Sequence, residues 1–195
     1  MSFEQVWHIP FHQDLLRLRD ALASVPPPAN LSRVPLMLRL QRDPDLSFLG
    51  QLVFKAGLDQ HQHDCIHILL GRGLLPMDQA FVLGFTLGSS KKGSLPEHKL
   101  RAEVGRHFNK NVPLFSEAEN AVFKDGIKLS YLSFCAPLEN FDFTPWHDLS
   151  LRELRQAVGL EPELVLAYYA VERHRYPHAL ASQRLLPNPA QAAGI

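Results

Sequence analysis

Three polar side chains within one short apolar stretch are the part of this sequence best suited to chemistry. His63, Asp64 and His67 lie in a segment that predicts a helix over 60–70. An α-helix turns about 100° per residue, so the two histidines lie about 40° apart on one face, one turn above the other. Asp64 lies within about the same quarter turn, so the three polar groups are expected to converge. Two imidazoles at this spacing, with a carboxylate beside them, predict a divalent-metal site.

The surroundings of this cluster predict that it is buried. Apolar residues cover most of the helix circumference, namely Cys65, Ile66, Ile68, Leu69 and Leu70. Two histidines four apart also occur on exposed helices, where they are solvated or structural and bind no metal. A buried helix must satisfy its polar side chains, and a metal ion or a polar network would do so. His61 is expected to point away from His63 and to lie at the surface.

The elements that position this cluster are predicted to be helices throughout. Apolar residues recur at helical spacing in several further segments, including 13–24, 32–43, 45–57, 76–88, 97–109 and 162–176. No stretch alternates with period two over a convincing length, so no strand is expected. We therefore predict an all-α fold, a single-domain bundle of about seven or eight helices over 1–186. The tail over 187–195 is expected to be disordered.

Two helix starts are specified locally by their residue spacing. Ser116 stands three residues before Glu119, and Ser150 stands three residues before Glu153. This is capping-box spacing, in which the serine and the glutamate satisfy backbone N–H groups at the helix start. Both pairs precede apolar-periodic segments, so we expect helices to begin there. Gly159 is expected to end the second of them.

Composition excludes several classes of function. Twenty Lys and Arg balance 20 Asp and Glu, so no net field favours nucleic acid as a partner. Cys65 and Cys135 are too far apart in sequence to form a spaced cysteine pair for zinc or a disulfide framework. The first residues lack the pattern of a secretory signal. The longest apolar run, 80–88, is much shorter than the roughly 20 residues of a transmembrane helix. We expect a cytoplasmic or membrane-peripheral protein.

The segment 62–88 resembles a known family. From Gln62 to Gly88 it reads QHDCIHILLGRGLLPMDQAFVLGFTLG. This segment is similar to the ubiquinone (coenzyme Q) biosynthesis family numbered four in the Coq series. That family is marked by His-Asp-x-x-His, eleven further residues and then Glu. A later segment, 146–159, also resembles the family. The likeness covers roughly residues 15–160 and is specific in the first segment.

The resemblance implies a ligand set for the metal. His63, Asp64 and His67 would be ligands, and the fourth position falls on Gln79, where the family has Glu. An amide oxygen is a neutral and weaker donor than a carboxylate, and it cannot act as a base. The adjacent Asp78 is charged but points about 100° away on its helix. The implied cofactor is a divalent metal, zinc or magnesium, and no residue is assigned a catalytic role.

The resemblance also implies a substrate and partners. Family members act on the ring of a polyprenylated aromatic precursor, by oxidative decarboxylation in which the ring carboxyl is replaced by hydroxyl. An isoprenoid tail would require an apolar channel, for which core packing is the competing interpretation; the candidates are Phe81, Val82, Phe85, Gly84 and Gly88. The two glycines would leave room for a lipid chain or for a neighbouring helix. Peripheral membrane contact, association with other ubiquinone-biosynthesis proteins and a homo-oligomer are compatible with this interpretation.

Two other functions remain open from the sequence. A metal-dependent phosphohydrolase of the His-Asp doublet type would need further ligands, for which His8, His12 and Asp125 are available. A non-catalytic isoprenoid-lipid-binding or scaffold protein would keep the fold without the glutamate ligand, which the glutamine at position 79 makes plausible. No nucleophile elbow or glycine-rich phosphate loop is present, so acyl transfer and nucleotide binding have no support.

Overall fold

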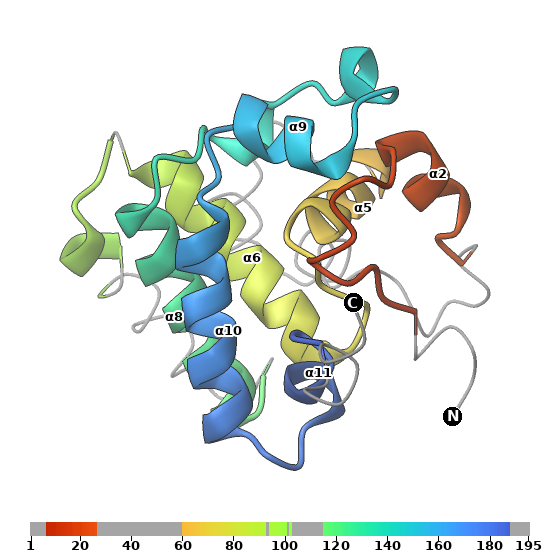
Figure 1. Ribbon diagram of the computed structural model, residues 1–195. Helices are drawn as coiled ribbons and strands as arrows, with labels where there is room; N and C mark the ends of the chain where they lie inside the picture. The colour runs from red at the N-terminus through yellow and green to blue at the C-terminus, as the bar shows by residue number, and fades with distance from the viewer. Residues whose placement is uncertain (1–6, 27–59, 93, 101, 103–114, 188–195) are drawn as a thin grey trace.

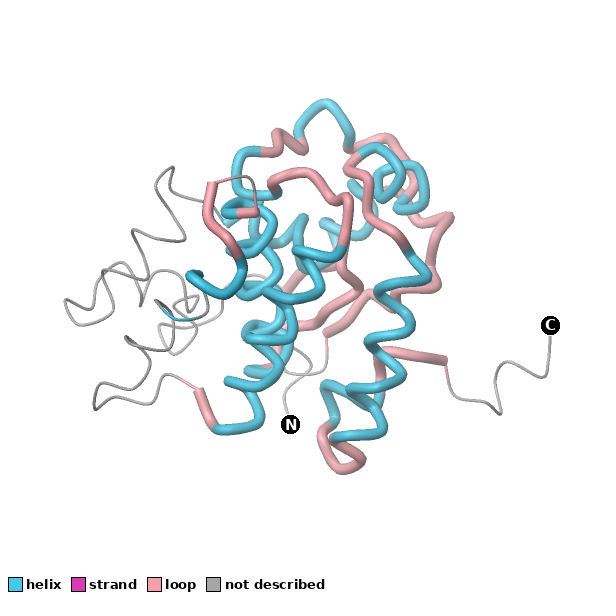
Figure 2. The backbone as a smooth tube through the Cα atoms, turned by 90° about the vertical axis from the view of Figure 1, so that its left-hand side faces the viewer, coloured by secondary structure: helices cyan, strands magenta, loops and turns pink. Residues whose placement is uncertain are grey.

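The computed structural model describes residues 7–26, 60–92, 94–100, 102 and 115–187, and its regular elements are helical (Figure 1). The α-helices are α2 (Leu18–Ala23), α5 (Gln60–Leu69), α6 (Pro76–Lys91), α8 (Glu117–Leu132), α9 (Leu151–Ala157), α10 (Pro162–Arg175) and α11 (Leu180–Gln183). Two 3₁₀-helices are η2 (Leu138–Asn140) and η3 (Thr144–Trp146). Within the described ranges the backbone contains helices and loops but no strand (Figure 2). The predicted all-α bundle is confirmed.

Some predicted elements lie outside the described residues. These are the helices expected over 32–43 and 45–57, most of the helix expected over 97–109, and the tail from residue 188. None of the helices within the described ranges is both long and apolar enough to cross a membrane.

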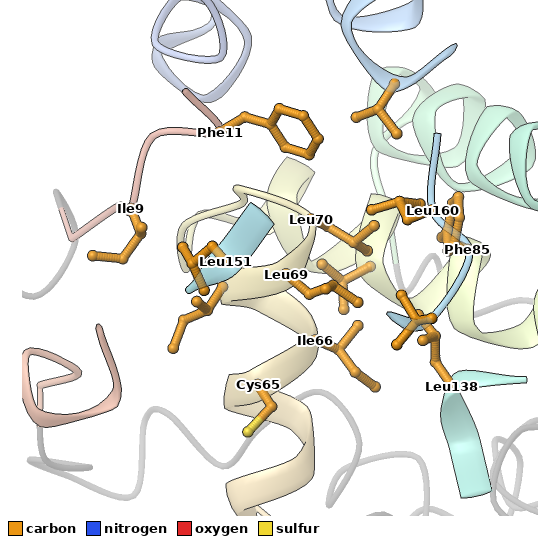
Figure 3. Packing of buried hydrophobic residues seen from close by; sticks show 14 of the residues in the cluster. Ile9, Phe11, Cys65, Ile66, Leu69, Leu70, Phe85, Leu138, Leu151 and Leu160 are labelled. Atoms are coloured by element: carbon orange, nitrogen blue, oxygen red, sulfur yellow. The ribbon is translucent and has the colours of Figure 1, made fainter. Parts of the chain in front are cut away.

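Helix α5 carries much of the hydrophobic core. Ile66 and Leu70 are fully buried, as are their neighbours Phe85 and Leu138. Figure 3 shows Ile66 and Leu70 on the side of α5 that faces Phe85 and Leu138. Burying one such side chain contributes about 1.5–3 kcal/mol to stability. The apolar surroundings predicted for the histidine helix are therefore present, and they fix its position.

Helix α6 packs against α8 at glycines, which allow the two backbones to approach closely. A Cβ atom on Gly84 would lie 2.1 Å from the carbonyl oxygen of Phe123. One on Gly88 would lie 2.8 Å from the carbonyl oxygen of Ile127. Gly126 makes the reciprocal approach from α8 onto the backbone of α6. The space at Gly84 and Gly88 is thus filled by a neighbouring helix, which is one of the two arrangements that the sequence allowed.

Both predicted capping boxes are confirmed. Ser116 Oγ accepts a hydrogen bond from the Glu119 N–H, and a Glu119 carboxylate oxygen accepts one from the Ser116 N–H at 2.8 Å. Ser150 and Glu153 make the same reciprocal pair at the start of α9. Gly159 follows α9 with a φ of 72°, a conformation that glycine adopts without strain. The beginnings of α8 and α9 and the end of α9 depend on residues close in sequence, so they could be predicted from the sequence.

The first predicted helix is shorter in the structure. The pattern predicts a helix over 13–24, whereas α2 begins only at Leu18. Before it the chain forms turns, and Arg17 is extended and bridges to Ser150. Leu18 N–H donates to the Leu149 carbonyl at 3.0 Å, and Leu151 N–H donates to the Leu16 carbonyl at 2.9 Å. Backbone hydrogen bonds to a distant segment therefore replace the first helical turn, a tertiary effect that overrides local propensity.

Candidate metal centre

The two histidines of α5 face each other through one pair of ring nitrogens. His63 and His67 lie one turn apart, with 5% and 0% of their surfaces exposed. Their Nε2 atoms are 3.2 Å apart, and the ring centroids are 4.4 Å apart at an interplanar angle of 68°. The i, i+4 spacing on a regular helix brings the rings together, and the apolar residues around them exclude water.

Burial keeps both imidazoles neutral at neutral pH. Desolvation lowers the pKa of His63 well below its ordinary value, and the neighbouring His67 lowers it further. Desolvation also lowers the pKa of His67, to about 4, although the backbone of Gly73 and the side chain of Gln79 act in the opposite direction. Among the described residues, neither Nδ1 atom has a hydrogen bond of good geometry. Neutral imidazole is the form that binds a metal ion.

Gln79 lies beside this pair, at the position that the family resemblance implies. Its side-chain amide is close enough to His67 to raise the pKa of that imidazole. Asp78 is turned elsewhere: its Oδ2 accepts a hydrogen bond from the Leu75 N–H at 3.1 Å and forms an ion pair with Arg184. Asp78 therefore caps α6, and Gln79 is the residue that approaches the histidines.

Asp64 does not lie at the meeting point of the two Nε2 atoms. Its Oδ1 accepts a hydrogen bond from Gln60 Nε2 at 2.8 Å and lies 3.9 Å from Nδ1 of His63. A carboxylate next to the far nitrogen of a metal-bound histidine orients the ring and raises its basicity. In the part of the chain that the structure describes, no three His, Cys, Asp or Glu side chains form a group suited to holding a metal. The two histidines converge, and Asp64 stands beside one of them.

The lipid-channel candidates pack against other parts of the chain. All are buried, namely Phe81, Val82, Gly84, Phe85 and Gly88. The ring of Phe81 stacks on Tyr168 with centroids 5.2 Å apart, and the Arg72 guanidinium lies 3.9 Å from the Phe81 centroid. These contacts belong to core packing, and isoprenoid binding by these residues stays a prediction.

A buried ionic network beside the site was not predicted from the sequence. Arg72 is fully buried and donates to both carboxylate oxygens of Glu172, at 2.9 and 2.6 Å. Burial lowers the pKa of Arg72, but Glu172 more than offsets this effect and the pKa is raised. The Arg72 N–H donates to the carbonyl of His67 at 2.8 Å, so the network holds the end of α5 that carries the site. The sequence does contain one sign of this network. Val165, Tyr169 and Glu172 recur at helical spacing, which places the glutamate on the buried face of α10.

The additional ligands of the phosphohydrolase interpretation have other partners. His8 Nε2 lies 2.9 Å from the Gly71 carbonyl oxygen, so it contacts the loop after α5 rather than the paired Nε2 atoms. Asp125 accepts from Lys128 at 3.0 Å and from Arg175 at 2.6 Å. His12 is exposed. No specific observation among the described residues therefore favours this alternative.

Comparisons of the chain with protein-family models, with curated proteins and with solved structures give no significant match.

Proposed function

We propose that this chain binds a divalent metal ion at His63 and His67, and that the site receives the aromatic head of a polyprenylated ubiquinone precursor. The metal-binding part rests on the geometry of the histidine pair. The substrate part rests on the resemblance of residues 62–88 to the ubiquinone-biosynthesis family. We therefore propose that the chain binds the aromatic acid. In the family that it resembles, this binding precedes decarboxylation and hydroxylation of the ring.

The separation of the two Nε2 atoms carries the proposal. Zinc–nitrogen bonds of about 2.0–2.1 Å at a tetrahedral angle place two nitrogen ligands about 3.3–3.4 Å apart. The distance between His63 Nε2 and His67 Nε2 is 3.2 Å. A hydrogen bond between two neutral imidazoles would have a similar length, and the metal count described below distinguishes the two. If each ring binds the metal through Nε2, its Nδ1 carries the proton. Asp64 Oδ1 lies 3.9 Å from Nδ1 of His63, on the side where that proton would be.

The remaining groups suit a weakly held metal ion. Gln79 offers a neutral amide oxygen to a cation beside His67. A bound divalent cation would supply a Lewis acid for the carboxylate or phenolic oxygen of an aromatic acid. Burial of His63 and His67 keeps both rings unprotonated, and the Arg72–Glu172 pair holds the turn that follows His67.

A metal count on purified protein tests this function. Protein stripped with a chelator is reloaded with Zn²⁺ or Mg²⁺, and bound metal is measured by elemental analysis. We expect His67→Ala to bind one equivalent less than the wild type, and His174→Ala, a matched change at an exposed histidine on α10, to bind as much as the wild type. Gln79→Glu should raise the occupancy, because a carboxylate replaces a neutral donor. A wild-type protein that binds no metal, or a His67→Ala variant that binds as the wild type does, would overturn the proposal.

The substrate is tested separately. Native mass spectrometry with a short-chain prenylated hydroxybenzoic acid should show a one-to-one complex with the metal-loaded wild type. The complex should be weaker in His67→Ala and in the metal-free protein. Equal binding by metal-loaded and metal-free protein would show that the metal does not contribute to substrate recognition.

A further inference from the structure

A second pair of histidines meets on the opposite side of α5, in a manner similar to the first. His61 comes from the first turn of α5, and His147 directly follows η3. Their Nε2 atoms are 3.1 Å apart, and their ring centroids are 5.0 Å apart at an angle of 62°. His61 is exposed and His147 is half-buried, so this pair is open to solvent. The two residues are 86 positions apart, and no sequence spacing connects them.

A thiol also stands near the same nitrogen. Cys65 Sγ lies 3.7 Å from His61 Nε2. A ring nitrogen carries either a proton or a lone pair, so it makes one strong hydrogen bond at a time. The Sγ–Nε2 separation is that of a weak hydrogen bond involving sulfur, so Cys65 is not counted as a metal ligand. The nitrogen–nitrogen separation is near the roughly 3.3–3.4 Å expected for two ligands of one zinc ion.

An anionic side chain lies close to the pair. The pKa of Asp142 is lowered mainly by hydrogen bonds from Thr144, and the charges of His147 and His61 lower it further. Thr144 N–H donates to Asp142 Oδ1 at 2.9 Å, which fixes the carboxylate at the start of the turn that carries His147. A carboxylate beside two imidazoles favours a cation between them.

Contacts that involve neither histidine side chain anchor each of the two segments to its neighbours. Gln62 Nε2 donates to the carbonyl oxygens of Leu138 and Glu139, at 3.1 and 2.8 Å, and so ties the start of α5 to η2. The backbone carbonyl of His147 accepts a hydrogen bond from the Arg19 N–H at 3.0 Å. The two imidazoles are therefore positioned before any ligand binds, which reduces the entropic cost of chelation.

We propose that His61 and His147 form a second, solvent-accessible site for a divalent transition-metal ion, which bridges α5 and the turn after η3. Two imidazole nitrogens bind the ion and water completes its coordination, an arrangement that needs no third protein ligand. Imidazole donors select zinc, nickel or copper over magnesium and calcium. This site is independent of the buried pair, and it holds whether or not the buried pair binds metal.

Calorimetric titration of the chelator-treated full chain with Zn²⁺ tests this site. Each of His61→Ala and His147→Ala should weaken the same binding event by more than roughly 100-fold, because even the outer partners of metal-bound histidines contribute 10–100-fold. The double variant should show no additional loss. His174→Ala, an exposed change on α10, should leave the event intact, and Mg²⁺ should not compete for it.

The variants also separate the two sites. His67→Ala should retain the binding event that depends on His61 and His147, and His147→Ala should retain the one that depends on His67. Loss in only one of the two single variants, or a titration unchanged in both, would overturn the second site. Circular dichroism of each variant establishes that the helices are retained, so that a loss of binding reports the ligand.

Discussion

Acidification is expected to destabilise the metal-free protein through His67. This imidazole is fully buried, and burial lowers its pKa from 6.5 to about 4. In the unfolded chain the same imidazole is solvated and keeps its ordinary pKa. The unfolded state therefore binds the proton more tightly than the folded state, and stability rises with pH over this interval. The stabilisation is fully present above pH 6.5 and is lost as the pH falls toward 4.

The magnitude follows from the two pKa values. A pKa of 6.5 in the unfolded state and about 4 in the folded state differ by roughly 300-fold in proton affinity, which corresponds to about 3 kcal/mol. At pH 4.5 the folded state has begun to take up the proton, so about 2 kcal/mol is lost relative to pH 7. His63 acts in the same direction, because burial lowers its pKa as well.

Urea denaturation at pH 7.0 and pH 4.5, with a chelator present, measures this effect. Other groups also titrate in this interval, so the informative quantity is the difference between the wild type and His67→Leu. We expect the variant to lose about 2 kcal/mol less than the wild type between the two pH values. His174→Gln, at an exposed position, serves as the control and should follow the wild type. Equal losses in wild type and His67→Leu would refute the reasoning.

Two further changes test the packing that holds the site. Glu172→Gln should lower the free energy of unfolding by about 3–5 kcal/mol in urea denaturation, because it removes the carboxylate that pairs with both ends of the buried Arg72 guanidinium and leaves only the longer contact with Asp78, at 3.8 Å. A loss below about 1 kcal/mol would contradict the importance of this ion pair. Gly88→Ala should cost about 1–3 kcal/mol, seen as a lower thermal midpoint, since its Cβ would lie 2.8 Å from the Ile127 carbonyl oxygen and 1.8 Å from Ser130 Oγ. An unchanged midpoint would show that α8 moves away from α6 without cost.

Features set by neighbours in sequence were predictable. The capping serines at 116 and 150 satisfy backbone groups three residues away, so their roles require no tertiary context. The start of α6 at Pro76 follows from a ring that is tolerated only in the first helical turn. The short helices η2, η3 and α11 contain three or four residues each, too few for a periodic pattern.

The helix predicted over 13–24 shows where rules based on local sequence fail. The leucines over 13–24 have helical spacing, yet the backbone from Leu16 to Leu18 bonds to Leu149 and Leu151. A helix and an interaction with a distant segment compete for the same N–H and C=O groups. The outcome depends on packing that a local pattern does not contain.

The sequence by itself determined that His63 and His67 share one face of a helix, because a period of 3.6 residues fixes their relative direction. It also indicated the apolar surroundings of that helix. The structure places Asp64 beside Nδ1 of His63 and away from the paired Nε2 atoms, with Gln60 of the same helix donating to its carboxylate. It alone brought His147 to His61 across 86 residues, because contacts between distant segments arise from packing and not from sequence spacing.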